Sequence, residues 1–142
     1  MFYEDRVFNF QRKHGAKNWW VWGEDRCLNV PIGLEDRISS IRFSGAPDDW
    51  KYDTVNLYSD PAFIGTEFFS YGDRPTLDNF DNRARSVIVS GCSGWTLYQY
   101  DHYQGESVCI TPSDTNTCSP GFYVSTHHLG VLAGGQREEL TV

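Results

Sequence analysis

The sequence lacks a long apolar run and an excess of positive charge. No stretch approaches the roughly 20 apolar residues that span a bilayer, and the start MFYEDRVFNF carries charges where a signal peptide has its apolar region. We therefore expect no transmembrane segment and no signal peptide, although a mature secreted chain with an added methionine would look the same. The 12 Lys and Arg against 19 Asp and Glu give a formal net charge of −7. Nucleic acid is not an expected partner, because phosphate binding requires clustered basic side chains.

Motifs of catalytic and metal sites are also missing. The sequence contains no nucleophile elbow, no HExxH zinc motif and no phosphate-binding loop. His127 and His128 are neighbours, so on a strand their side chains point to opposite faces and cannot easily share a metal. His14 and His102 lie far from them in the sequence. We predict that the protein is not an enzyme.

The chain has four cysteines, an even number that permits two disulfides. Their spacing fits neither a paired CxxC zinc site nor a redox motif. Cys109 and Cys118 flank the turn-rich segment ITPSDTNT, and a disulfide between them could close this loop. The alternative is that the cysteines, including Cys27 and Cys92, are buried thiols that pack as small apolar side chains. Disulfides would favour an extracellular origin, so we favour secretion over an intracellular location.

The chain is rich in short segments that favour strands. Aromatic residues make up 15% of the sequence and hydrophobic residues 39%, which is enough for the core of a compact domain. Segments such as TVNLYS, TEFFSY, RSVIVSG, WTLYQY and ESVCIT are rich in β-branched and aromatic residues, and Gly, Pro, Asn and Asp separate them. This pattern predicts an all-β sandwich.

One pattern, Y-x-x-x-x-[FY]-x-G, occurs twice, as YSDPAFIG at residues 58–65 and as YQYDHYQG at residues 98–105. A weaker copy begins at FYEDRVF, where Tyr3 and Phe8 have the same spacing but Phe10 replaces the glycine. We therefore expect an irregular first hairpin, with an insertion in NFQRKHGAKNWW. Each copy also has a candidate closing strand: RISSIRFSG, RARSVIVSG and, more loosely, REELTV. Three repeats of a four-stranded unit would account for nearly the whole chain.

These elements resemble those of the βγ-crystallins, most strongly over residues 54–110. The resemblance implies an all-β Greek-key β-sandwich of βγ-crystallin type, in which two aromatic rings pack at the corner of each folded hairpin. It also implies a glycine with positive φ after each ring pair and a serine of the closing strand that hydrogen-bonds the hairpin. The residues assigned to these roles are Tyr58, Phe63, Gly65, Ser86, Tyr98, Tyr103 and Gly105.

Three motifs leave one without a partner, because domains of this family pair two Greek keys. We predict a divergent first motif at residues 1–50 and a two-motif domain at residues 51–142. The alternative pairs the first and second motifs and leaves the third as the extra one. An unpaired motif would expose an apolar face, so it should pack on its neighbour or on another chain, which makes a homodimer possible.

The resemblance also implies calcium binding through [ND]-[ND]-x-x-[ST]-S, which EDRISS at residues 35–40 and DNRARS at residues 81–86 approximate. Ca²⁺ prefers carboxylate, hydroxyl and carbonyl oxygens. In the second segment Arg85 stands where the family has a hydroxyl ligand. The alternative is that EDRISS is a solvated turn whose hydroxyls cap backbone groups. The implied ligands are Glu35, Asp36, the Arg37 carbonyl, Ser39, Asp81 and the Arg83 carbonyl.

The run NWWVW suggests an aromatic surface. Trp19, Trp20 and Trp22 could contact a glycan, a protein or a membrane interface, or they could form a strand whose alternate indoles enter the core. Our leading interpretation is a non-catalytic structural or stress-related protein, with calcium as a possible ligand. The alternative is a secreted binding or defence module, such as a proteinase inhibitor, an antimicrobial protein or a toxin component.

Overall fold

The computed structural model describes residues 1–10, 16–23 and 27–124. This part of the chain is all-β, apart from three short 3-10 helices. Within these ranges no helix has the length and apolarity needed to cross a membrane. The strands are β1 (Phe2–Tyr3), β2 (Asn18–Trp19), β3 (Ser40–Ile41), β4 (Thr54–Asp60), β5 (Ile64–Ser70), β6 (Ser86–Ser90), β7 (Trp95–Tyr100), β8 (Gln104–Ile110) and β9 (Gly121–Val124). The 3-10 helices are η1 (Val7–Asn9), η2 (Pro61–Phe63) and η3 (Asp78–Phe80).

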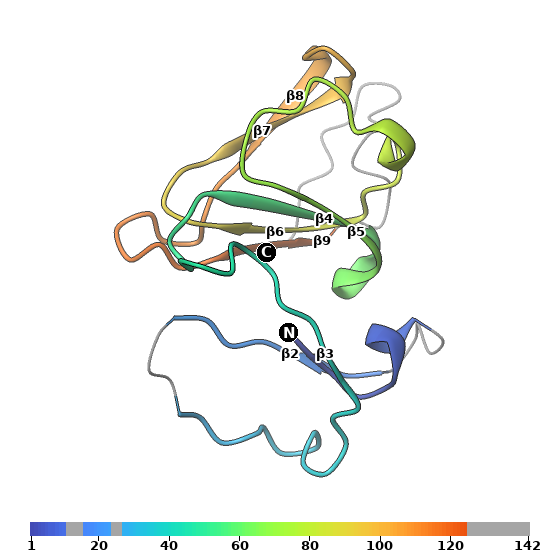
Figure 1. The fold of residues 1–142 in the computed structure, drawn as a ribbon, viewed down its shortest axis with the longest axis vertical. Helices are drawn as coiled ribbons and strands as arrows, with labels where there is room; N and C mark the ends of the chain where they lie inside the picture. The colour runs from blue at the N-terminus through green and yellow to red at the C-terminus, as the bar shows by residue number, and fades with distance from the viewer. Residues whose placement is uncertain (11–15, 24–26, 125–142) are drawn as a thin grey trace.

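A four-stranded antiparallel sheet, in the order β5-β4-β6-β9, forms the middle of the molecule (Figure 1). β4 and β5 form a hairpin, and β6 pairs with the other edge of β4. β9 follows β7 and β8 in the chain but pairs with β6. The third repeat thus supplies a strand to the sheet of the second repeat. This connection is that of a Greek key, and it confirms the predicted all-β Greek-key fold class.

The hairpin of β7 and β8 covers one face of this sheet (Figure 1). Side chains alternate between the two faces of a strand, so every second residue of β4 and β6 points toward this hairpin. The buried residues of this core are Val55, Leu57, Phe80, Ala84, Val87, Val89 and Ile110. Phe68, Leu77, Trp95, Leu97 and Tyr123 pack against them. Burial of these mainly apolar side chains stabilises the sandwich through the hydrophobic effect.

The first repeat covers the opposite face of the same sheet (Figure 1). Tyr58 and Ile88 alternate along their strands with the residues of the first core, so they point to this other side. They belong to a second buried cluster, whose members are Met1, Tyr3, Tyr58, Phe63, Ile64 and Ile88. Phe8, Trp20 and Phe122 pack against it. The first repeat therefore packs on its neighbour, and the central sheet is buried on both faces.

The first repeat has its own three-stranded sheet, in the order β2-β1-β3. Its register copies that of the second repeat. Tyr3 lies opposite Ser40, as Tyr58 lies opposite Ser86. Each of its strands has only two residues, and a longer connection separates β1 from β2 than the three residues of η2 that separate β4 from β5. The first repeat is thus a shortened version of the same unit.

Candidate functional site

The folded corner of the second hairpin is held by two rings and a serine. The rings of Tyr58 and Phe63 meet edge to face, with centroids 6.0 Å apart. The hydroxyl of Ser86 accepts a hydrogen bond from the Phe63 amide (3.0 Å) and donates one to the Asp60 carbonyl (2.7 Å). Gly65 follows with a φ of 84°, a value that favours glycine. Since Ser86 is fully buried, this corner is a rigid part of the core.

The corner of the third hairpin has the same ring arrangement at the surface. The rings of Tyr98 and Tyr103 are 5.6 Å apart and meet edge to face, and Gly105 has a φ of 79°. A Cβ on this glycine would lie 2.7 Å from Cδ2 of Tyr100, too close for a side chain. Unlike the second corner, this one leaves its tyrosines exposed, at 41% and 47% of their surface.

The first hairpin is irregular, as predicted, with strands of two residues each, but its corner has the same ring and serine contacts as the second. The rings of Tyr3 and Phe8 are 5.6 Å apart. The hydroxyl of Ser40 accepts from the Phe8 amide (3.1 Å) and donates to the Asp5 carbonyl (2.6 Å), as Ser86 does in the second repeat. Phe10 has a φ of −61°, so glycine is not required there. The alignment of RISSIRFSG with RARSVIVSG was the signal for this serine.

The two segments implied in calcium binding have the same backbone turn. Asp36 and Asn82 occupy matching positions and have positive φ values of 56° and 55°. In each turn the next amide donates to the carbonyl of a buried apolar residue. These bonds run from Arg37 to Leu34 (3.2 Å) and from Arg83 to Phe80 (3.2 Å). The turns are therefore built by their buried apolar residues, independently of any ligand.

Three of the side chains in these segments have partners within the protein. The implied ligand residues are all exposed: Glu35, Asp36, Arg37, Ser39, Asp81 and Arg83. The Arg37 guanidinium pairs with Glu4. The Asp81 carboxylate accepts a hydrogen bond from Nδ2 of Asn82 (3.0 Å), and Arg83 donates to the Asn79 carbonyl (3.2 Å).

The two segments belong to different repeats. Residues 35–40 lead into β3 of the first repeat, whereas residues 81–86 run from η3 into β6 of the central sheet (Figure 1). Within the described ranges, no three His, Cys, Asp or Glu side chains are grouped so as to hold a metal ion. The shared clamp that the resemblance implied also draws on hydroxyl and carbonyl oxygens, so it too stays a prediction. Calcium binding by either segment alone stays a prediction.

The disulfide joins Cys92 to Cys118, which corrects the predicted pair of Cys109 and Cys118. Cys109 lies on the exposed side of β8, and its thiol is free, as is that of Cys27. Cys92 lies in the turn after β6, where its own amide (2.8 Å) and that of Ser93 (2.9 Å) donate to the carboxylate of Asp53. Burial alone would raise the pKa of Asp53, but these hydrogen bonds outweigh it and lower the pKa.

The three tryptophans do not form one surface. Trp20 packs against Phe122, with ring centroids 4.8 Å apart, and Trp22 contacts the same phenylalanine at 6.3 Å. Trp19 instead lies against Phe2, with centroids 5.4 Å apart. Because neighbouring residues of a strand point to opposite faces, Trp19 and Trp20 serve different sides of the first repeat. Of the three tryptophans, Trp22 is exposed, at 37% of its surface, whereas Trp19 and Trp20 are partly buried.

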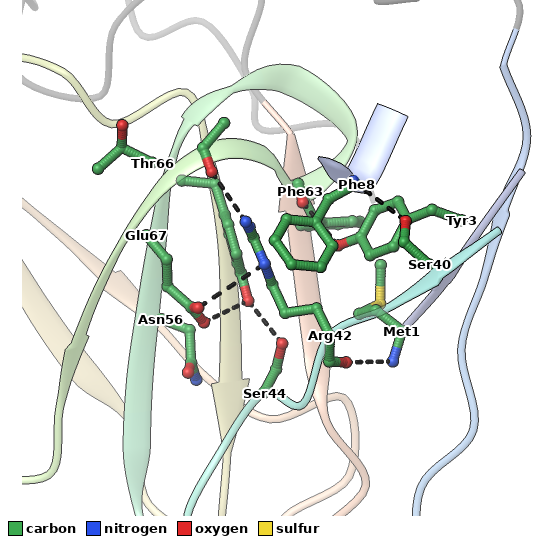
Figure 2. Close-up of polar contacts among 12 residues, drawn as sticks. Met1, Tyr3, Phe8, Ser40, Arg42, Ser44, Asn56, Phe63, Thr66 and Glu67 are labelled. Atoms are coloured by element: carbon green, nitrogen blue, oxygen red, sulfur yellow. Dashed lines mark hydrogen bonds and ion pairs between the residues drawn. The ribbon is translucent and has the colours of Figure 1, made fainter. Parts of the chain in front are cut away.

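A network centred on Arg42 connects the first and second repeats (Figure 2). Its guanidinium lies 3.9 Å from the centroid of the Phe8 ring, donates to the Gly65 carbonyl (3.0 Å) and pairs with Glu67 (3.9 Å). Glu67 also accepts a hydrogen bond from the Tyr58 hydroxyl (2.9 Å). No sequence pattern predicts this network, because its members come from distant parts of the chain.

Burial in this network perturbs several titrating groups. Burial raises the pKa of Tyr3 to about 12. The pKa of Tyr58 is raised by burial and then by the negative charge of Glu67. The amino group of Met1, which donates to the Arg42 carbonyl (2.9 Å), has its pKa lowered by burial and then by the Arg42 charge. Neutral phenols thus belong to the folded state of this interface.

A cavity of about 560 Å³ opens between the central sheet and β7. Leu57, Phe68 and Leu97 contribute to its apolar part, and Arg74 and Asp101 to its polar part. Histidine and cysteine are absent from the described residues that line it. The cavity has the size of a ligand site.

The fold and the corners together define a Greek-key sandwich of βγ-crystallin type. A sequence model of the peptidase inhibitor family I36 matches residues 53–110. The chain is 39% identical over 57 residues to gamma-crystallin C of Macaca mulatta, a match that covers 39% of this chain and 32% of that protein. The chain thus spans about a third of the length of this curated relative. No solved structure matches the chain significantly. The resemblance is confirmed: the chain carries a βγ-crystallin superfamily unit, matched over part of its length.

Proposed function

We propose that the chain is a non-catalytic structural module of βγ-crystallin type, whose role depends on its remaining folded under stress. The observation that carries this proposal is the burial of the central sheet on both faces. Val87 and Val89 are fully buried on one side, and Tyr58 and Ser86 on the other. A β-sheet buried on both faces exposes a large apolar area to water when it unfolds, and the free-energy cost of this exposure opposes unfolding.

Three observations support the absence of catalysis. The described lining of the cavity has no histidine or cysteine, and the strongest pKa shifts belong to tyrosines that pack between repeats. Neither relative bears the name of an enzyme.

The exchange of β9 into the sheet of the second repeat supports the pairing of the second and third motifs. The division at residues 50 and 51 stays a prediction.

Hydrogen exchange tests the structural role. We expect the amides of β4 and β6 to exchange only when the whole molecule unfolds, because both faces of these strands are covered. The amides of β8, whose side chains are mostly exposed, should exchange faster and serve as an internal control. Exchange of the β6 amides at rates far above global unfolding would contradict the proposal.

Calcium is the finer part of this proposal and depends on residues 35–40 alone. Its support is a set of exposed oxygens from Glu35, Asp36 and Ser39 on a preformed turn. If calcium binds the folded state, the melting temperature should rise between EDTA and millimolar calcium, and Asp36→Asn should abolish the rise. Asp81→Asn serves as the matched control at the other segment. No rise in the parent protein would eliminate calcium and leave the structural role in place.

The match to a peptidase inhibitor family favours a second candidate, namely inhibition of a peptidase. Exposed tyrosines gather within the matched residues, and tyrosine is enriched at protein interfaces. They are Tyr71, Tyr98, Tyr100 and Tyr103. The full chain should inhibit at least one member of a panel of serine, cysteine, aspartic and metallopeptidases.

Tyrosine variants decide whether this surface is responsible. Tyr71→Ala and Tyr100→Ala should each weaken inhibition by about tenfold or more, the effect of losing a central contact. Tyr52→Ala is the control, because Tyr52 is also exposed but lies just outside the matched residues. An absence of inhibition across the panel would eliminate this candidate.

A further inference from the structure

The outward face of the first repeat consists of residues that form a core in the second repeat. Phe2 lies opposite Ile41 on β3 and opposite Trp19 on β2. In the second repeat Leu57 lies opposite Val87 and Phe68 at the same register positions. Both sets therefore belong to equivalent faces of equivalent sheets.

These equivalent faces differ in burial. Val87 and Val89 are fully buried beneath the hairpin of β7 and β8. Their counterparts in the first repeat, Ile41 and Phe43, are each 64% exposed. Exposed large apolar side chains on one face of a sheet mark an interaction surface.

Within the chain, the equivalent faces of the second and third repeats pack against each other. Leu97 precedes the corner tyrosine of the third repeat, as Leu57 precedes that of the second. Leu97 lies opposite Val108, as Leu57 lies opposite Phe68. Leu57 and Leu97 nevertheless meet in one core. The core of the sandwich thus joins the same repeat positions from two motifs, so the surface is self-complementary.

We propose that the outward face of the first repeat binds the same face of a second copy of the chain, forming a two-fold dimer. Two equal copies of one patch form a closed, isologous contact. The dimer would bury Ile41 and Phe43 as Val87 and Val89 are buried within the chain. This inference is independent of the proposed function, because it uses residues outside the matched segment 53–110.

Sedimentation equilibrium of the full chain tests the dimer. The parent protein should show a concentration-dependent mass that approaches twice that of one chain. Ile41→Asp and Phe43→Asp should each raise the dissociation constant at least about tenfold. Burying a carboxylate in an apolar contact costs more free energy than a tenfold change in the dissociation constant represents. Tyr71→Asp is the matched control, since Tyr71 is 76% exposed and lies in the second repeat.

Two results would overturn the proposed dimer. A parent protein that is monomeric at about 1 mM, where even a very weak dimer would form, overturns the proposal and leaves the face to a different partner. A dimer that persists in both aspartate variants also overturns it, because another surface must then carry the contact. Circular dichroism checks that the variants fold. If an aspartate variant unfolds, Phe43→Thr replaces it as a milder change with the same expected direction.

Discussion

The two faces of the central sheet are covered by repeats of the same kind but with different chemistry. The face toward β7 and β8 is aliphatic in both middle strands, as Leu57 and Val87 illustrate. The face toward the first repeat carries buried polar side chains among its apolar ones. These are Thr54, Asn56, Tyr58, Ser86 and Ser90. The comparison separates the aliphatic side chains, which stabilise the sheet, from the buried polar side chains, which set the position of the first repeat.

The polar side chains of the second face are hydrogen-bonded. Asn56 accepts from the amide of Gly45 (3.1 Å) through Oδ1 and donates to the Ile88 carbonyl (3.3 Å) through Nδ2. The hydroxyls of Thr54 and Ser90 are 2.5 Å apart. Such bonds add little net free energy when made but are costly to break in a buried site. The aliphatic face therefore supplies most of the stability, and the polar face fixes the register of the first repeat.

The largest expected effect comes from an aliphatic residue of the first face. Leu57→Ala should lower the free energy of unfolding by about 3 kcal/mol, because a buried leucine is lost and a cavity remains. Phe2→Ala, at the equivalent position of the first repeat, should cost about 1 kcal/mol in dilute protein, because Phe2 is only partly buried. Urea denaturation measures both. Equal losses would show that the outward face of the first repeat is as well covered as the core.

Alkaline pH should weaken the polar face. Unfolded tyrosine ionises near pH 10, whereas folded Tyr3 keeps its proton up to a pKa of about 12. Between these values the folded state binds more protons than the unfolded state, so the free energy of unfolding falls as pH rises. For Tyr3 this amounts to about 2–3 kcal/mol over the two pH units, and the raised pKa of Tyr58 adds to the loss.

Single-site variants sharpen this pH test. Tyr3→Phe should flatten the pH dependence of stability above pH 10, because it removes one of the ionising groups. The control is Tyr52→Phe, since Tyr52 is 57% exposed and lies outside the network around Arg42. Denaturation curves at several pH values give the slope. An unchanged slope in Tyr3→Phe would mean that this phenol does not control the interface.

Local features of this fold could be predicted from the sequence. The all-β class follows from short strand-like segments. The ring pairs were implied by the resemblance to the βγ-crystallins, which rests on the repeated spacing, and the structure shows Tyr58 against Phe63 and Tyr98 against Tyr103. A turn brings such residues together whatever the rest of the chain does, so the pattern contains the necessary information.

Features that depend on distant segments could not be predicted in this way. The short loop between Cys109 and Cys118 suggested a disulfide, but β8 points Cys109 outward and the turn after β6 brings Cys92 to Cys118. The network around Arg42 likewise needs two repeats packed face to face. The composite calcium clamp stays a prediction for the same reason, since the packing of the repeats, and not the motif, decides which turns are neighbours.

The smallest expected effect compares the same serine in two repeats. Ser86→Ala should cost about 2 kcal/mol, because it leaves the buried Phe63 amide and Asp60 carbonyl without their bridging hydroxyl. Ser40→Ala removes the matching bonds of the first repeat but should cost about 1 kcal/mol, because Ser40 is partly exposed and water can take its place. Thermal and urea denaturation of the two variants give the ratio. If Ser40→Ala cost as much as Ser86→Ala, the first repeat would be as deeply integrated into the cooperative unit as the second, and its short strands would be no sign of weakness.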